Sequence, residues 1–321
     1  MTKAVGWALA GLAALVGVVL AVPVGGGLLG IAQLVAFRAI VAIGLAVAAL
    51  LVAALLFFLP RPRRSAAVPL VVALTLGSLA QVAVLAVRTG GSAQADGSTS
   101  VVVLEFNTLG VVPPQTIADL AREHHANVVV LAETSQATAT AARDLLARDG
   151  IEMQEHIAPS ADALVSGVAL LVSPTVGEYP TAAIVPMRRG ALVAEASGDG
   201  PTLAAVHPVA PSSIAKMGDW RTETRTAADQ CATHPGAIVA GDFNATLDHP
   251  GLSHLGPCVD AAREVGKAAT GTWPSAAPTW LATPIDHVLV DSRVWRVLDF
   301  EVLPATGGSD HRPVVATIEA R

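Results

Sequence analysis

The chain has 321 residues, of which 52% are hydrophobic and 14% charged, and its formal net charge is −6. These averages conceal two regions: residues 1–94 contain no Asp or Glu, whereas residues 95–321 hold all 26 acidic residues and 14 of the 20 basic ones, a net charge of −12. So acidic a second region argues against duplex nucleic acid as the main partner, because such binding draws much of its affinity from neutralised phosphates.

Three apolar runs, at 5–24, 39–59 and 66–87, occupy the first region. Each has about the ~20 residues that a helix needs to cross a bilayer. A cleaved signal peptide fits the first run poorly, because two more full-length runs follow it. We therefore expect a membrane anchor at 1–88 with three transmembrane helices. A transporter is disfavoured, since the runs contain no acidic residue to carry an ion or proton.

The basic residues of the first region predict its orientation. Arg61, Arg63 and Arg64 lie between the second and third runs and Lys3 precedes the first, whereas Arg38 is a single charge at the other end of the second run. Because short cytoplasmic loops are enriched in Lys and Arg, the chain is predicted to be a multi-pass protein of the cell membrane. Everything beyond residue 88 would then be extracytoplasmic. The Gly- and Ser-containing stretch 89–99 predicts a flexible tether.

The chain has only two cysteines, Cys231 and Cys258, and both lie in the exported region. A pair of cysteines in an oxidising compartment is consistent with a disulfide. Two buried free thiols are the alternative, and the sequence leaves both open.

In the region 100–321, short apolar runs are separated by polar segments of helical length or by turns. Buried strands are predicted at 101–106, 128–131, 168–172, 192–196, 203–206, 237–240, 285–290, 295–303 and 314–318, and helices at 116–125, 137–149 and 213–234. The helices are too few to supply one crossover for each strand. We therefore expect an α+β sandwich of two mixed sheets with helices outside, rather than a doubly wound parallel sheet.

Polar side chains stand at the ends of many of these strands. They are Asn107, Glu133, His207, Asp242, Asn244, Asp286, Asp310 and His311. One polar residue at a strand end is usually a cap or a turn former, but agreement among so many strand ends is harder to attribute to turns. Carboxylates for a hard cation, an imidazole for a proton and amides for oxygen atoms are the groups that metal-assisted attack on phosphorus requires.

In their order along the chain, Asn107, Glu133, His207, Gly241-Asp242-Phe243-Asn244, Ile285-Asp286-His287 and Ser309-Asp310-His311 resemble the endonuclease/exonuclease/phosphatase superfamily. Thr272-Trp273-Pro274 resembles members that are attached to bacterial membranes. The resemblance covers a catalytic domain at 100–321. It implies a four-layer α/β sandwich, two packed mixed sheets flanked by helices, with the site where the sheets open at one edge. It also implies cleavage of a phosphoester with Mg²⁺, for which Mn²⁺ can substitute.

The resemblance also implies roles for individual residues. Asn107, Glu133, Asp286 and Asp310 would be the metal group, and His207, Asp242, Asn244, Asp310 and His311 the catalytic group. His311 resembles the general base or electrostatic partner of the attacking water, with Asp310 fixing its tautomer. Whether His311 or Asp242 takes the proton stays open. Asn244 would hold a phosphoryl oxygen, and His207 would stabilise charge on the phosphoryl group or the leaving oxygen.

Two positions depart from the family pattern. Ala132 stands where Gln often precedes the metal glutamate, and Leu109 stands where some nucleases carry a second metal carboxylate. The second departure favours a one-metal site and weakens the analogy to abasic-site endonucleases. Arg188-Arg189 is the one local basic pair of the exported domain. Solvated loop charge is the favoured interpretation of this pair, and contact with a substrate phosphate is the alternative.

These features predict a membrane-anchored, divalent-metal-dependent phosphodiesterase or phosphatase. It would act outside the cytoplasm on a lipid head group, an envelope phosphate or a nucleotide. An extracellular metal-dependent nuclease is the enzymatic alternative. A non-catalytic surface module that binds a ligand and signals through the three helices is the alternative from another class, and the complete set of polar residues speaks against it.

Overall fold

The computed structural model describes residues 3–22, 25–58, 60–93 and 100–321. The chain divides into two compact units, Met1–Arg88 and Thr89–Arg321. Residues 94–99, which make up most of the predicted tether, lie outside the described part of the chain.

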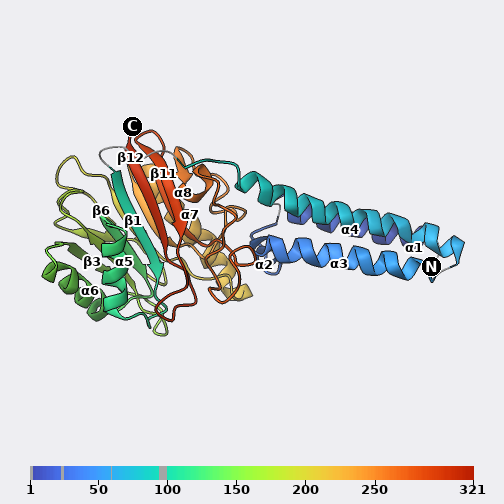
Figure 1. The fold of residues 1–321 in the computed structure, drawn as a ribbon, viewed down its shortest axis with the longest axis horizontal. Helices are drawn as coiled ribbons and strands as arrows, with labels where there is room; N and C mark the ends of the chain where they lie inside the picture. Colours follow the sequence, from blue (N-terminus) through green and yellow to red (C-terminus); the bar gives the residue numbers. More distant parts are fainter. Residues whose placement is uncertain (1–2, 23–24, 59, 94–99) are drawn as a thin grey trace. The chain divides into compact units, whose positions relative to one another are not determined.

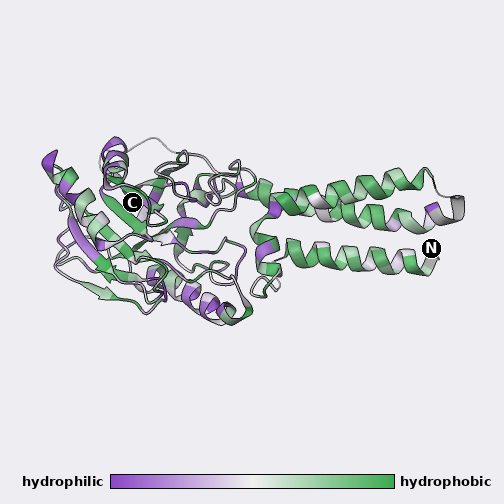
Figure 2. Ribbon diagram, turned by 90° about the horizontal axis from the view of Figure 1, so that it is seen from below, coloured by the Kyte–Doolittle hydropathy of each residue, from purple (hydrophilic) through white to green (hydrophobic). Residues whose placement is uncertain are grey.

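The first unit consists of helices (Figure 1): α1 (Lys3–Ala21), α2 (Ile31–Ala36), α3 (Arg38–Leu56) and α4 (Arg61–Arg88). Within it, Ala4–Ala21, Arg38–Leu56 and Arg64–Arg88 are long and apolar enough to cross a bilayer. In Figure 2 the residues of these helices are mostly hydrophobic (green). The three predicted spans therefore exist as helices, whereas the short α2 was not predicted.

Arg38, the one charge that opposed the predicted orientation, is buried inside the first unit. Its guanidinium donates a hydrogen bond of 2.6 Å to the Leu20 carbonyl and another to the Gln81 side chain. Polar side chains in membrane bundles usually face the bundle interior in this way. Because Arg38 is bonded to the other helices of its own bundle, it does not count as a loop charge in the argument from basic residues.

Two six-stranded mixed sheets form the second unit (Figure 1). The first sheet has the order β11-β12-β1-β2-β4-β3 and the second the order β5-β6-β7-β8-β10-β9. The strands are β1 (Ser100–Asn107), β2 (Val128–Ala132), β3 (Gln154–Ala158), β4 (Val168–Val172), β5 (Ala182–Ile184), β6 (Ala191–Ala194), β7 (Leu203–Val206), β8 (Ile238–Asp242), β9 (Cys258–Asp260), β10 (Asp286–Asp291), β11 (Trp295–Val302) and β12 (Val314–Ala320). The predicted α+β sandwich is confirmed.

Successive side chains of each strand point to opposite faces of the sheet, so the first sheet has an apolar core on each face. In β1, Val103 packs in the core shared by the two sheets, whereas Leu104 and Phe106 pack beneath α5 (Pro114–Glu123) and α6 (Gln136–Arg148). The second sheet is accompanied by η1 (Ile214–Lys216), α7 (Met217–Thr233) and α8 (Ala261–Glu264). α5 and α6 therefore cover the outer face of the first sheet, whereas Ala261 and Ala262 of α8 pack in the core between the sheets, and the odd-numbered residues of β1 face that interior.

The two cysteines form the disulfide that the sequence left open. Cys231 in α7 and Cys258 in β9 are joined with a Cα–Cα distance of 6.2 Å, and neither cysteine of the chain is free. The bond closes a loop of 27 residues and ties a helix of the outer layer to the edge of the second sheet.

Candidate active site

The strand directions bring the predicted polar residues to one edge of the sandwich. The parallel strands β1 and β2 end together, which places Asn107 beside the residue that follows β2, Glu133. The parallel strands β7 and β8 likewise end together and present His207 and Asp242. Asp286 begins β10 directly opposite Asp242, because these two strands are antiparallel.

The loops at this edge adopt a rarely populated backbone conformation. Three of the four described non-glycine residues with positive φ belong to it, namely Leu109 at 52°, Glu133 at 52° and Asn244 at 48°. Such conformations cost about 1–3 kcal/mol each and persist where the surroundings hold them. Here the Leu109 N–H donates to Asn107 Oδ1 (3.0 Å) and the Asn244 N–H donates to Asp242 Oδ1 (2.8 Å). The site residues themselves therefore hold the loops.

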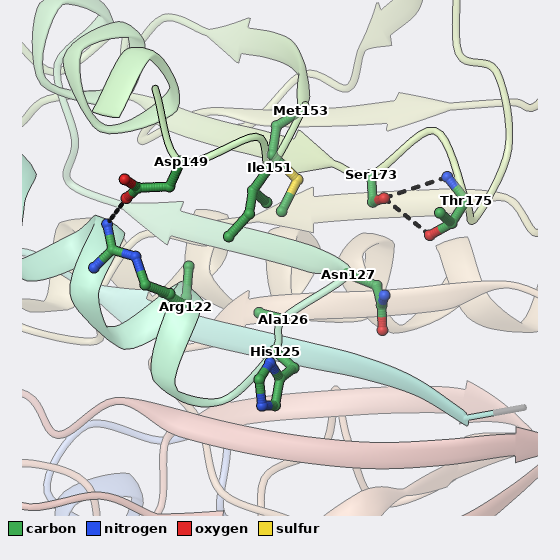
Figure 3. A pocket seen from close by; sticks show the side chains of 10 residues that line it. Arg122, His125, Ala126, Asn127, Asp149, Ile151, Met153, Ser173 and Thr175 are labelled. Carbon is green, nitrogen blue, oxygen red and sulfur yellow. Dashed lines mark hydrogen bonds and ion pairs between the residues drawn. The ribbon is translucent and has the colours of Figure 1, made fainter. Parts of the chain in front are cut away.

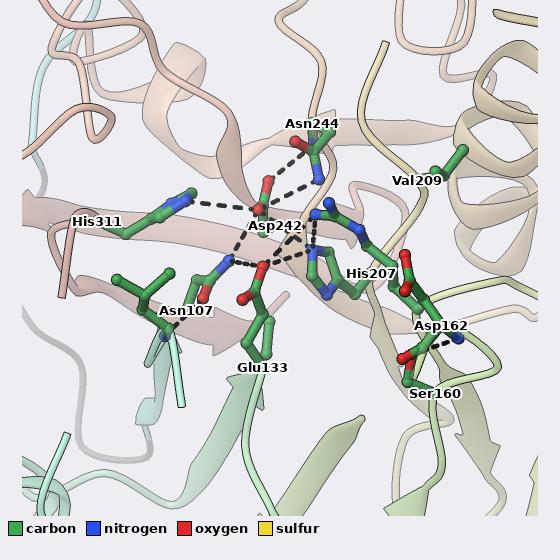
Figure 4. A network of polar contacts seen from close by, with 12 residues as sticks. Asn107, Glu133, Ser160, Asp162, His207, Val209, Asp242, Asn244 and His311 are labelled. Carbon is green, nitrogen blue, oxygen red and sulfur yellow. Dashed lines mark hydrogen bonds and ion pairs between the residues drawn. The ribbon is translucent and has the colours of Figure 1, made fainter. Parts of the chain in front are cut away.

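A compact polar network links Glu133 to Asp242 (Figure 4). Asn107 Nδ2 lies 3.0 Å from Asp242 Oδ2 and 3.4 Å from Glu133 Oε1. His207 Nε2 lies 3.4 Å and 3.7 Å from the same two oxygen atoms. Asn244 Nδ2 adds a contact of 3.3 Å to Asp242 Oδ2. Residues predicted from four different segments thus converge on one small volume.

Arg189 is a site residue that the sequence analysis did not assign. Its NH1 atom lies 3.2 Å from His207 Nε2 and 3.5 Å from Glu133 Oε1, and its side chain is only 16% exposed. The interpretation as solvated charge was wrong for Arg189. It holds for Arg188, whose side chain is 53% exposed and pairs with Asp219. Both residues lie at the centre of a turn in which the Gly190 N–H donates to the Met187 carbonyl (3.3 Å), and their side chains leave this turn in different directions.

His311 is oriented by Asp286. Its Nδ1 atom lies 3.0 Å from both carboxylate oxygens of Asp286, and its Nε2 atom lies 3.7 Å from Asp242 Oδ2. Ser309 fixes the loop, because its hydroxyl accepts the His311 N–H (3.0 Å) and donates to the Asn107 carbonyl (2.6 Å). The ring is therefore held between two carboxylates.

Asp310 lies against Trp273 as well as near His311. Its Oδ2 accepts a hydrogen bond of 2.9 Å from Trp273 Nε1, and its Oδ1 lies 4.0 Å from the Nε2 atom of His311. Asp286, and not Asp310, is the carboxylate at Nδ1, and the role of Asp310 in fixing the tautomer of His311 stays a prediction. Asp310 lies outside the hydrogen-bonded network of Glu133 and Asp242.

Electrostatics in the site favour ion pairs. Burial opposes charge on His311, but the carboxylates of Asp286 and Asp242 outweigh it and raise the pKa of His311 to about 9. Burial also opposes ionisation of Asp242, yet His311 and His207 hold the pKa of Asp242 below its usual range. For Asp286, burial outweighs the attraction of His311 and the pKa is raised. Of Asp242 and Asp286, Asp242 is therefore the one whose carboxylate stays ionised more readily.

The donor atoms at this edge suit a hard divalent cation. Asp242, Asp286 and His311 offer ligand atoms within 4.8 Å of one another. Glu133, with a side chain that is 15% exposed, is more open than those three and lies against Asn107. Carboxylate oxygens are ligands that Mg²⁺ prefers, whereas Asn107 faces these carboxylates with its Nδ2 atom and its Oδ1 accepts the Leu109 N–H.

A separate groove of about 820 Å³ lies at the opposite end of β2 (Figure 3). His125 and Ser173 are among its lining residues. Arg122, the cation that borders it, is already paired with Asp119 and Asp149. The groove brings together no set of catalytic groups comparable to the network at Asp242.

Fold and site together point to the two-sheet sandwich class in which phosphoester hydrolases are found. The model of the Endonuclease/Exonuclease/phosphatase family matches residues 104–311, and the chain belongs to this family. Members are typically metal-dependent hydrolases of phosphoesters, including nucleic acids. No curated protein matches the sequence at a significant level.

Solved structures share the fold at low sequence identity. An endonuclease/exonuclease/phosphatase from Beutenbergia cavernae is 19% identical, with 69% of this chain and 72% of that chain covered and a TM-score of 0.52. TDP2 of D. rerio complexed with a single-strand DNA product is 13% identical, covering 69% and 100%, with a TM-score of 0.55. The human Nocturnin catalytic domain with bound sulfate is 16% identical, covering 71% and 97%, with a TM-score of 0.55. At these identities the solved structures show that the chain shares the four-layer fold, and they show nothing about its activity.

Proposed function

We propose that the chain is a membrane-anchored, divalent-metal-dependent phosphodiesterase or phosphatase whose catalytic unit acts outside the cytoplasm. The observation that carries this proposal is the convergence of Asn107, Glu133, His207, Asp242 and His311 on one edge of the sandwich. Three apolar helices support the anchor, and the disulfide supports an oxidising compartment.

Glu133 would hold the metal, Mg²⁺ with Mn²⁺ as a substitute, and Asn107 would join it by turning its side-chain amide, because its Nδ2 atom now faces Glu133 and Asp242. Such an ion, when bound, offsets negative charge on the phosphoryl oxygens and orients the ester. Asp286 was also expected in the metal group. Its two contacts with His311 Nδ1 favour an orienting role instead, in which it keeps the ring aimed at Asp242. For Asp310, the hydrogen bond from Trp273 favours a role at the rim of the site.

Asp242 would orient the attacking water by accepting a hydrogen bond from it. Its carboxylate is held by the Asn244 N–H, and its lowered pKa keeps it ionised at neutral pH. His311 then stabilises the developing charge beside Asp242. His207 and Arg189, whose nitrogen atoms lie 3.2 Å apart, face the same volume and would donate to phosphoryl oxygens or to the leaving oxygen.

An extracellular nuclease is the second candidate function. The D. rerio TDP2 structure holds a single-strand DNA product. The net charge of −12 over residues 95–321 disfavours this function, because binding a polyanion to an acidic surface carries a repulsive cost.

Hydrolysis of bis(p-nitrophenyl) phosphate by the purified full chain tests the proposal. We expect turnover with Mg²⁺ or Mn²⁺ that is lost on chelation and in both Glu133→Ala and His311→Ala. Glu123→Ala and His254→Ala are matched controls, because both side chains are exposed and lie outside the site. Absence of turnover across a broad panel of phosphoesters would instead support a binding module.

Thiol labelling tests the proposed orientation. Both native cysteines are in the disulfide, so Ser92→Cys introduces the only free thiol. On intact cells this thiol should react with a membrane-impermeant reagent. Labelling only after lysis would reverse the orientation.

A further inference from the structure

Exposed large apolar side chains of the second unit gather at the end that carries the site. Among its described residues they are Leu109, Val111, Leu164, Ile184, Ile214, Trp280 and Val294. Val294 alone belongs to the far end, between the close of β10 and the start of β11. Single exposed apolar residues are normal on any protein, but their concentration around one site is not.

Two of the apolar loops adjoin the first sheet's side of the site. Leu109 lies two residues after Asn107, and its N–H donates to the Asn107 side chain. Leu164 is 95% exposed and lies in the loop between β3 and β4. That loop is fastened beside Arg189, because Ala161 N–H donates 2.8 Å to the carbonyl of Arg188.

Two more apolar side chains lie on segments that border the second sheet's side. Ile214, 81% exposed, begins η1 after the loop whose Pro208 carbonyl accepts a hydrogen bond of 3.0 Å from Asn244 Nδ2. Trp280, 60% exposed, lies in the segment that carries Trp273, the donor to Asp310. Apolar side chains thus stand on four separate loops around one polar centre.

The net negative charge of the second unit limits which partners the exposed apolar side chains could contact. Arg188, the exposed cation beside the site, is already paired with Asp219, and residues 95–321 carry a net charge of −12. Neither a polyanion nor an anionic surface would be attracted electrostatically. The interior of a lipid interface accepts Leu, Ile and Trp side chains without needing cationic partners. A chain with three bilayer-length apolar helices also brings such an interface within reach.

We propose that this apolar rim, defined as Leu109, Val111, Leu164, Ile214 and Trp280, inserts into the lipid interface and delivers the phosphoester of a membrane amphiphile to the site. The identity of the substrate class rests on the proposed function. The insertion itself does not require turnover.

Depth-dependent quenching tests the insertion. The full chain is reconstituted in phosphatidylcholine nanodiscs after Leu164→Cys or Ile214→Cys is labelled with an environment-sensitive fluorophore; the native cysteines are paired, so only the new thiol reacts. Doxyl-labelled lipids should quench both labels. They should not quench the matched control Val294→Cys at the far end. Equal quenching at all three positions, or none at 164 and 214, overturns the proposal.

Hydrolysis separates the rim from the chemistry. The substrate for this test is a long-chain alkyl p-nitrophenyl phosphate dissolved in the nanodisc lipid. The double variant Leu164→Ser, Ile214→Ser should cleave it roughly tenfold more slowly than the parent chain, because its effective affinity for the lipid-borne ester falls by the same factor. Its rate on soluble bis(p-nitrophenyl) phosphate should match that of the parent chain and of Val294→Ser. Equal loss on both substrates contradicts a lipid-binding rim. If the parent chain cleaves neither ester, the proposed function fails, while the quenching result still decides the insertion.

Discussion

Glu105 is a buried carboxyl with no hydrogen-bond partner among the described residues. It lies on β1 with both oxygen atoms unsatisfied, and its position in the strand places it on the same face as Asn107, toward the interior between the sheets. Burial, with further repulsion from Asp286 and Asp242, raises its pKa well above the ordinary value. Leaving a buried polar group unpaired costs about 1–3 kcal/mol.

We therefore expect Glu105→Met to stabilise the second unit by about 2 kcal/mol, because an unbranched apolar side chain of similar length fills the same space. For a unit of this size the melting temperature should rise by roughly 4–8 °C. Tryptophan fluorescence of the full chain in detergent measures this, since four of the five tryptophans belong to the second unit. Glu105→Gln is the matched control, because it removes the charge but keeps the unpaired polar group.

The raised pKa of Glu105 also predicts how the stability of the second unit changes with pH. A carboxyl whose pKa is raised on folding favours the folded state most below its unfolded pKa of about 4.3, and that contribution is lost as the pH rises through the folded pKa. Glu105→Gln should therefore remove the part of the fall in stability with rising pH that comes from ionisation of Glu105. A melting temperature that falls in Glu105→Met would refute the reasoning and show that a bound partner, such as a cation, satisfies Glu105.

Three further predictions concern the site and the disulfide. Asp286→Asn should lower kcat by roughly 10²–10⁴ with little change in KM, because His311 loses the carboxylate that orients it, and the pKa of His311 should fall; a pH–rate profile identical to that of the parent chain would contradict this. Glu133→Gln should weaken the apparent Mg²⁺ affinity by at least roughly tenfold, as measured by metal titration of activity, and an unchanged midpoint would exclude Glu133 as a ligand. Replacing Cys231 and Cys258 together with Ser should destabilise the second unit by about 3 kcal/mol, since the bond closes a loop of 27 residues; dithiothreitol should shift the melting temperature of the parent chain equally and leave that of the variant unchanged.

The strands that the sequence missed have one property in common. β3, β5 and β9 are each at the edge of a sheet; part of β3 and of β9 is buried, and no residue of β5 is. β3 reads Gln-Glu-His-Ile-Ala, and β5 and β9 have three residues each. Edge strands need no continuous apolar run, because one side of the strand lacks a neighbour. Interior strands such as β2 and β4 bury every residue, and their apolar runs made them predictable.

The composition of the site was predictable because strand ends are visible in a sequence. Which group contacts which was not, because contacts across a sheet depend on side-chain direction. Asp310 is adjacent to His311 in the chain, yet Asp286, from another strand, reaches Nδ1. Arg189 turns inward and Arg188 outward. The sequence reads Arg-Arg, so it does not show which of the two side chains enters the site.

The loop that carries Asn244 is fastened from beneath, which explains how its positive φ persists. Trp220 Nε1 donates to the Asn244 carbonyl (2.9 Å), and His287 Nε2 lies 2.9 Å from the Ala245 carbonyl. A carbonyl only accepts, so Nε2 carries a proton; the other ring nitrogen, Nδ1, lies 2.7 Å from the carboxylate of Asp260. Burial opposes charge on His287, but Asp260 outweighs it and raises the pKa, which is what a ring that donates on both sides requires. Residues outside the catalytic network thus act together with Asp242 to set the geometry of the loop before any substrate binds, and this preorganisation lets the loop hold its strained backbone.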